Sequence, residues 1–238
     1  MVLVDDNFAT IVGAVREGRI SFENLRKGVR YYRACKAALI STALLPVLLG
    51  VPVPFAPVQI ILMELFMDLA ASAAFVAEPA EAASMSRPPR DPKAKFLDDS
   101  MVQSIFASAA GLFAAVCGVY LATWNSGAGL ITAQTMAFAT WLVGHVFLAF
   151  NLRSEREPLF RVGFFTNWVM VIWAMATVAV LLVATFVPAT RQLIKVASLQ
   201  PMQWAVVLGA ALAGTFWIEV CKLILAIRTR KSRESTTA

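Results

Sequence analysis

Residues 54–77 read PFAPVQIILMELFMDLAASAAFVA, and this stretch decides what kind of protein the chain can be. It is apolar over a length that can cross a bilayer core, which takes about 20 helical residues. It shows no strand-like alternation, and it carries two carboxylates, Glu64 and Asp68, near its middle. A run of this kind predicts a transmembrane helix with acidic groups at membrane depth.

The composition of the whole chain agrees with a membrane protein. Of its 238 residues, 59% are hydrophobic and 15% are charged, and the mean hydropathy is +0.69. Soluble domains have an apolar fraction of about 45–50%. The net charge of +6 comes from basic residues that flank the apolar runs, which favours contact with lipid headgroups over nucleic acid. The three cysteines lie far apart, without the spacing of a metal or redox site.

Working outward from residues 54–77, the chain divides into six apolar runs after an amphipathic N-terminal segment. The runs span residues 31–50, 54–77, 101–124, 133–151, 165–188 and 204–227. They predict an all-α membrane protein with six transmembrane helices. Residues 2–30 carry charged and apolar side chains at helical spacing, which predicts a short cytoplasmic helical stalk with Gly18 as a candidate break.

The distribution of Lys and Arg predicts that both ends of the chain lie in the cytoplasm. Basic residues gather in the N-terminal arm, in the loops after the second and fourth runs and in the tail. They are Arg16, Arg19, Arg26, Lys27, Arg30, Arg87, Arg90, Lys93, Lys95, Arg153, Arg156, Arg161, Arg228, Arg230, Lys231 and Arg233. The opposite loops hold only Arg191 and Lys195, so the positive-inside rule indicates an N-in, C-in topology. The expected domains are a cytoplasmic stub and stalk (1–30), a six-helix membrane domain (31–228) and a basic tail (229–238).

Glu64 and Asp68 are the strongest functional signal, since an ionised group at membrane depth costs on the order of 2.5–3.5 kcal/mol. They lie four residues apart, which places both carboxylates on one face of a helix. Two like charges there need a nearby cation or a proton, and Lys36 on the adjacent arm could be that cation. The functional interpretation is an ion or proton site. The alternative is a structural cluster of Lys36, Glu64 and Asp68 without a transport role.

Four further ionisable groups lie within the apolar runs, and of these Arg33 is expected to extend to the membrane interface. His145 is the only histidine. It could be either a core residue whose ring nitrogens are hydrogen-bonded or a member of the site. Glu219 and Lys222 lie three residues apart near the end of the last run, so we expect them to pair or to reach the interface.

Several motifs of phosphoryl-transfer chemistry are missing from the sequence. It holds no GxxxxGK[ST] loop and no DKTGT, TGD or GDGxND motif. We therefore expect no catalytic residues, no cofactor site and no ATPase activity from this chain alone.

Five stretches make the chain resemble the C-terminal membrane region of P-type cation-transporting ATPases, of the calcium-pump and sodium-pump branch. They are DDNFATIVGAVREGR (5–19), GRISFENLRKGVRYY (18–32), VPFAPVQIILMELFMD (53–68), EPAEAASMSRPPRDP (78–92) and TMAFATWLVGHVFLAFNLRSE (135–155). The resemblance implies that the six runs are the fifth to tenth spans of such a pump. It also implies that the start of the chain is the last piece of the phosphorylation domain.

The resemblance extends to candidate cation-binding residues. Asp68 matches the family's sixth-span aspartate, and Glu64 matches a position that is asparagine in calcium pumps and acidic in some proton- or sodium-exchanging pumps. Lys36 matches a fifth-span asparagine, and His145 matches an eighth-span glutamate of the reticulum calcium pump.

Two expected oxygen ligands are absent, because Leu39 stands where the fifth span usually has Glu and Met67 replaces the usual Thr. Calcium needs several oxygen ligands. The candidate residues therefore favour proton-coupled chemistry over a high-affinity calcium site. They do not identify a metal.

The leading hypothesis is therefore the C-terminal membrane half of a cation pump that contributes part of the cation pathway. ATP and Mg²⁺ would bind only to a missing catalytic part, and the expected partners are the bilayer, the transported cation and an N-terminal pump half or intact pump. The alternatives are a free-standing membrane scaffold or regulatory subunit, a passive channel or secondary transporter, and a truncated relic of a pump. The expected location is a bacterial inner membrane.

Overall fold

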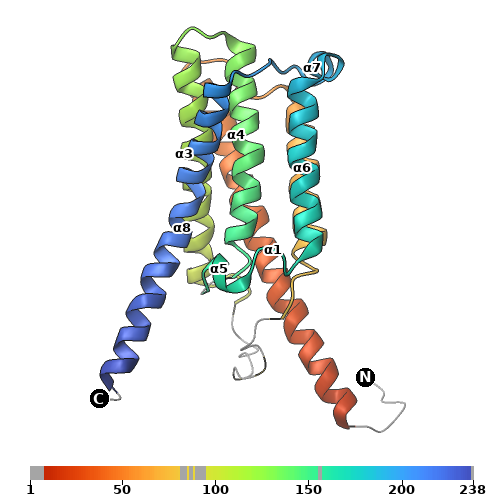
Figure 1. Cartoon of the computed structure of the whole chain (residues 1–238), viewed down its shortest axis with the longest axis vertical. Helices are drawn as coiled ribbons and strands as arrows, with labels where there is room; N and C mark the ends of the chain where they lie inside the picture. Colours follow the sequence, from red (N-terminus) through yellow and green to blue (C-terminus); the bar gives the residue numbers. More distant parts are fainter. Residues whose placement is uncertain (1–7, 81–84, 86–87, 89–94, 155–156, 237–238) are drawn as a thin grey trace.

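The computed structural model describes residues 8–80, 85, 88, 95–154 and 157–236, and all regular elements in these ranges are helices (Figure 1). In chain order they are α1 (Phe8–Leu48), α2 (Pro57–Leu69), the π-helix η1 (Ala70–Ala74), α3 (Asp99–Asn125), α4 (Leu130–Asn151), α5 (Leu159–Val162), α6 (Trp168–Phe186), α7 (Pro188–Ile194) and α8 (Pro201–Thr236). The all-helical prediction is confirmed for these residues. The short helices α5 and α7 and the π-helix η1 were not predicted.

Within the described residues, five helical segments are long and apolar enough to cross a membrane. They are Pro57–Ala74, Asp99–Asn125, Leu130–Asn151, Trp168–Phe186 and Pro201–Ile224. The chain is therefore an integral, multi-pass membrane protein. The apolar half of α1 is not among the five, since it contains Arg33 and Lys36.

Helix α1 runs without interruption through Gly18, so the break considered there does not occur. A helical glycine costs only about 1 kcal/mol relative to alanine, and the helix continues for several turns on either side. The stalk and the predicted first span are therefore one continuous helix of 41 residues.

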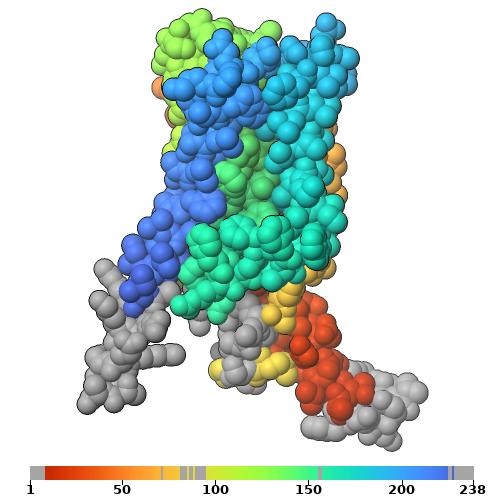
Figure 2. Space-filling model, viewed as in Figure 1, coloured from red at the N-terminus to blue at the C-terminus, as the bar shows by residue number. Residues whose placement is uncertain are grey.

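Helix α4 forms the centre of the bundle, and most of its residues are buried. It packs against α3 and α8, while α6 approaches it from another side (Figure 1). The space-filling view shows α4 between α8 and α6, which form part of the outer surface (Figure 2). Their outward side chains include Ile172, Met175 and Leu208, all exposed, which suits contact with lipid.

Small residues allow close packing of α3 against α8. A Cβ added at Gly111 in α3 would lie 2.2 Å from the carbonyl oxygen of Gly214 in α8. One added at Gly214 would lie 2.6 Å from the Gly111 carbonyl oxygen. Only glycine permits this approach at the crossing of α3 and α8.

The first turns of α1 and the last turns of α8 lie at the same end of the bundle, and α7 lies at the opposite end (Figure 1). Four basic residues of the charge argument, Arg87, Arg90, Lys93 and Arg156, lie outside the described residues, as does most of the RPPRDP segment.

Candidate functional site

Lys36 and Glu64 meet between α1 and α2. The Lys36 ammonium donates to the Glu64 carboxylate, and their side chains are 32% and 29% exposed. The ammonium also lies 5.4 Å from the centroid of the Tyr32 ring, within range of a cation–π interaction. The contact expected from the sequence is therefore present, and it is partly exposed.

Asp68 lies one turn beyond Glu64 on α2, and its side chain is exposed. Among the described residues, no ion pair joins it to Lys36 or to any other base. The Asp68 backbone carbonyl accepts a hydrogen bond of 2.7 Å from the Ser72 hydroxyl. The two carboxylates thus have different environments, since Glu64 has a cationic partner and Asp68 has none.

The interior beside these groups is apolar where the family usually supplies oxygen ligands. Leu39 is 5% exposed and Met67 is fully buried. Within the described ranges, no group of three or more His, Cys, Asp or Glu side chains could hold a metal ion.

His145 is completely buried on α4, and among the described residues no hydrogen bond or ion pair joins it to Lys36, Glu64 or Asp68. Its ring stacks on Trp141 at 4.5 Å and meets Trp173 of α6 edge to face at 5.4 Å. Its Nδ1 lies 3.0 Å from the Trp141 carbonyl oxygen, and its Nε2 has no hydrogen-bond partner. Because a carbonyl only accepts, Nδ1 carries the proton in the neutral ring and Nε2 is a free acceptor.

The expected pair of Glu219 and Lys222 is confirmed on α8, and both side chains are buried. Lys222 donates to Glu219 Oε1 at 2.8 Å and also to the Asn151 carbonyl oxygen. The other Glu219 oxygen accepts from the Leu159 backbone N–H at 2.7 Å. The pair therefore joins α8 to the ends of α4 and α5.

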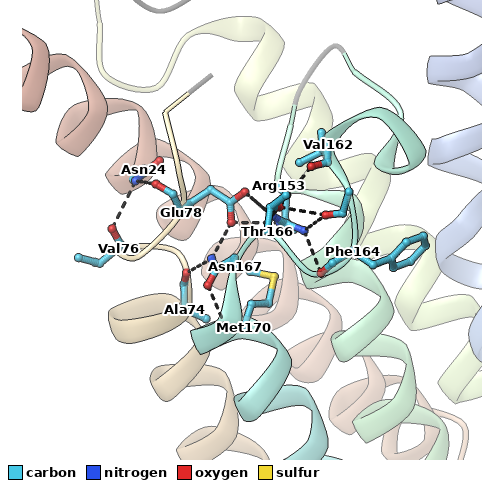
Figure 3. Close-up of polar contacts among 11 residues, drawn as sticks. Asn24, Ala74, Val76, Glu78, Arg153, Val162, Phe164, Thr166, Asn167 and Met170 are labelled. Carbon is cyan, nitrogen blue, oxygen red and sulfur yellow. Dashed lines mark hydrogen bonds and ion pairs between the residues drawn. The ribbon is translucent and has the colours of Figure 1, made fainter. Parts of the chain in front are cut away.

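One buried polar cluster of the described structure was not predicted. We call it the Glu78 junction and define it as Asn24, Glu78, Arg153, Thr166 and Asn167 (Figure 3). Arg153 Nη2 lies 2.8 Å from Glu78 Oε1, and Nε donates to both carboxylate oxygens at 2.9 and 3.0 Å. The two side chains are 1% and 3% exposed.

The other members of the Glu78 junction form hydrogen bonds with Arg153 or Glu78. Arg153 Nη2 donates to the Thr166 hydroxyl at 2.5 Å, and Asn167 Nδ2 donates to Glu78 Oε2 at 2.7 Å. Asn24 Nδ2 donates to the Glu78 carbonyl oxygen at 2.6 Å. The junction thus ties α1, the segment after η1, the end of α4 and the start of α6 together.

Sequence reasoning missed this pairing because Arg153 was counted as a topology charge and Glu78 as part of the EP sequence. The two residues lie 75 positions apart, and no local pattern predicts such a contact.

A looser ion pair lies where α3 begins. Arg26 Nη2 donates to Asp98 Oδ2 at 2.6 Å, while Asp98 Oδ1 accepts from the Met101 N–H and caps α3. The hydrogen bond from Arg26, followed by the one from Met101, lowers the pKa of Asp98 to about 2. This carboxylate therefore stays charged far into the acidic range.

Comparison with known proteins identifies a family for this chain. The model of the cation transporting ATPase C-terminus matches residues 52–224. The chain is 32% identical over 220 residues to a calcium-transporting ATPase of Bacillus subtilis, covering 91% of this chain and 24% of the relative. It is 30% identical over 230 residues to a probable cation-transporting ATPase F of Mycobacterium bovis, covering 97% and 25%. A mouse calcium-transporting ATPase type 2C member 2 is 26% identical over 227 residues, covering 94% and 24%.

The chain therefore belongs to the family of C-terminal membrane regions of P-type cation-transporting ATPases. The resemblance stated from the sequence is confirmed. The chain spans about a quarter of the length of these curated relatives.

Proposed function

We propose that this chain works as the C-terminal membrane part of a cation pump and supplies part of the path that the cation takes. The observation that carries the proposal is the placement of Glu64 and Asp68. Glu64 is held by Lys36, whereas Asp68, one turn further along α2, is exposed and lacks an ionic partner among the described residues. A carboxylate at membrane depth is costly unless it takes up a proton or meets a cation.

The proposed topology has six spans with both ends in the cytoplasm. The span added to the five long apolar helices is the first run, residues 31–50, most of which lies in α1. Its Lys36 charge is offset by Glu64, and Arg33 can extend its guanidinium toward the membrane surface. In this scheme residues 1–30 form the stub and stalk, 31–228 the membrane domain and 229–238 the tail, and the membrane is a bacterial inner membrane. Cysteine labelling of single sites at residues 50 and 127 from outside intact cells tests this topology.

The proposed cation is a proton or another cation that needs few oxygen ligands. Leu39 and Met67 offer none from their side chains, and calcium requires six to eight oxygens. Lys36 can exchange between Glu64 and water or solvent-exposed groups, because the pair is half open. His145 adds a buried acceptor at Nε2, which would extend a proton path toward α4.

The part that hydrolyses ATP would come from a partner. ATP and Mg²⁺ would bind to an N-terminal pump half, which would carry the phosphorylated aspartate. Co-expression with that half should give a complex that co-purifies and forms an acid-stable phosphoenzyme from ATP. A pair that forms no phosphoenzyme would exclude the split-pump scheme and favour a scaffold or a relic.

The site itself is tested by Asp68→Asn in the same complex. This change removes the charge and keeps the shape, so the protein should insert normally while ATP-driven transport into vesicles falls to background. Transport that survives the change would show that Asp68 is not a cation ligand. Transport of calcium that is insensitive to pH gradients would exclude the proton-coupled version.

A further inference from the structure

Two side-chain donors, one in α6 and one at its N-cap, hold the segment of α2 and η1 that contains Asp68. The Trp173 indole Nε1 donates to the Phe66 carbonyl oxygen at 2.8 Å. Asn167 Nδ2 donates to the Ala74 carbonyl oxygen at 2.7 Å, a contact visible in Figure 3. Phe66 lies between Glu64 and Asp68 in sequence, and Ala74 is the last residue of η1. Helix α6 therefore binds the backbone on both sides of Asp68.

The Ala74 carbonyl needs a donor from outside its own helix. Its partner in a continuing π-helix would be the N–H of residue 79, which is a proline and has none. The N–H of Glu78 is already used, since it donates to the Phe75 carbonyl oxygen at 3.2 Å. Asn167 thus supplies the hydrogen bond that the backbone of this segment lacks.

The Phe66 carbonyl lies where the helix changes from α to π geometry. The Ala70 N–H is shared between the Met67 and Phe66 carbonyl oxygens, while the Phe75 N–H reaches back five residues to Ala70 at 3.1 Å. A side chain that enters the hydrogen-bond ladder in this way is a recognised cause of helix distortion, and π turns are frequent at functional sites.

Both donors are themselves held in place. The Trp173 ring meets His145 of α4 edge to face at 5.4 Å and Tyr31 of α1 at 6.5 Å. Asn167 Oδ1 accepts from the Met170 N–H at 3.0 Å and caps α6. Both residues are buried, so their donors have fixed positions from which to bind α2.

We infer that Asn167 and Trp173 are positioning residues for the cation path: together they hold the α-to-π change that follows Leu69, and so they fix the end of α2 that carries Asp68 against α6. Neither residue forms a hydrogen bond with either carboxylate, so they act through the backbone of α2. The inference rests on the proposed function, because only that function gives Asp68 a task, but the geometry can be measured without transport.

The test compares how fast Asp68 and Glu64 react with dicyclohexylcarbodiimide in the full chain in lipid nanodiscs, with the product at each site quantified by mass spectrometry. Trp173→Phe keeps the ring contacts and removes the N–H. Asn167→Ser keeps a cap for α6 and removes the amide donor. Trp168→Phe, on the exposed side of the same helix, is the matched control.

The ratio of the Asp68 rate to the Glu64 rate should change roughly five-fold in each of the two variants. Loss of a hydrogen bond worth about 1 kcal/mol changes the population of the held backbone by about this factor. The control should keep the wild-type ratio. Deuterium exchange of the amides of residues 70–75 should also be faster in both variants than in the control.

An unchanged ratio with unchanged exchange in both variants would overturn the inference. So would an equal rise at both carboxylates, because that result means general loosening of the bundle. If one variant does not insert, the other decides, and if neither carboxylate reacts, the exchange rates decide. Failure of the proposed function has a different signature, namely transport that survives Asp68→Asn while the labelling ratio still changes.

Discussion

Glu64 in α2 and Glu78 just after η1 each pair with a basic side chain, yet their surroundings differ. Glu64 has Lys36 as its ionic partner, and both side chains are about a third exposed. Glu78 is enclosed by the Glu78 junction, where Arg153 and Asn167 donate to its carboxylate and Asn24 to its carbonyl oxygen.

The two carboxylates therefore differ in how easily each can exchange its ionic partner. A fully bonded buried ion pair has no spare acceptor and is costly to open. A half-open pair with one strong contact can exchange its partner for water, a proton or another cation. The Glu78 junction therefore suits a structural tie, and the region of Lys36, Glu64 and Asp68 suits transport.

Breaking the Glu78 junction should have the largest effect on stability. Arg153→Met leaves Glu78 as a buried, uncompensated carboxylate, so the free energy of unfolding should fall by about 3–5 kcal/mol. Unfolding in mixed micelles measures this loss. Arg161→Met, at an exposed position, is the control and should change stability by less than about 0.5 kcal/mol. A loss below about 1 kcal/mol for Arg153→Met would mean that the enclosed pair is no stronger than a surface pair.

Opening the Lys36–Glu64 pair should cost much less. Lys36→Met should lower the free energy of unfolding by on the order of 1 kcal/mol, because about a third of each side chain is exposed and Glu64 can be neutralised by a proton. The same unfolding measurement applies, with Lys36→Arg as the variant that retains the charge. A loss as large as that of Arg153→Met would remove the contrast between the two glutamates.

The smallest effect should come from the Arg26–Asp98 pair, which sharpens the comparison because Asp98 is open to solvent. Its folded pKa of about 2 lies below the unfolded value of about 3.9. The charge therefore stabilises the fold above about pH 4, and this contribution is lost as the pH falls through about 2. Asp98→Asn keeps a cap for α3 and should lower stability at pH 6 by less than about 1 kcal/mol.

The difference in stability between wild type and Asp98→Asn should shrink as the pH falls from about 4 toward 2, which thermal unfolding at a series of pH values can show. A difference that persists unchanged at pH 2 would mean that the Asp98 charge is not its source.

Most of the helices could be predicted from the sequence, because apolar runs of membrane length have few other stable structures. The interruption considered at Gly18 was wrong, since one glycine costs too little to end a helix of 41 residues. The π-helix was missed because AASAA has no local signature of it. Its geometry depends on donors from α6, which lie about a hundred residues further along the chain.

The candidate site was predictable only in part. Lys36 and Glu64 belong to neighbouring arms of a hairpin, so their contact followed from local spacing. Whether His145 belongs with them could not be read from one histidine in an apolar run, and the structure places it in an aromatic cluster of α4 and α6.

The sequence by itself determined that this is a helical membrane protein of the cation-pump family, because hydropathy, charge placement and the EP and RPPR motifs are properties of short segments. Only the tertiary structure decided which charges are enclosed and which are open. That outcome depends on contacts between helices far apart in the chain, such as Arg153 with Glu78 and Trp173 with Phe66. Burial and hydrogen-bond satisfaction arise when helices pack, and no local pattern encodes them.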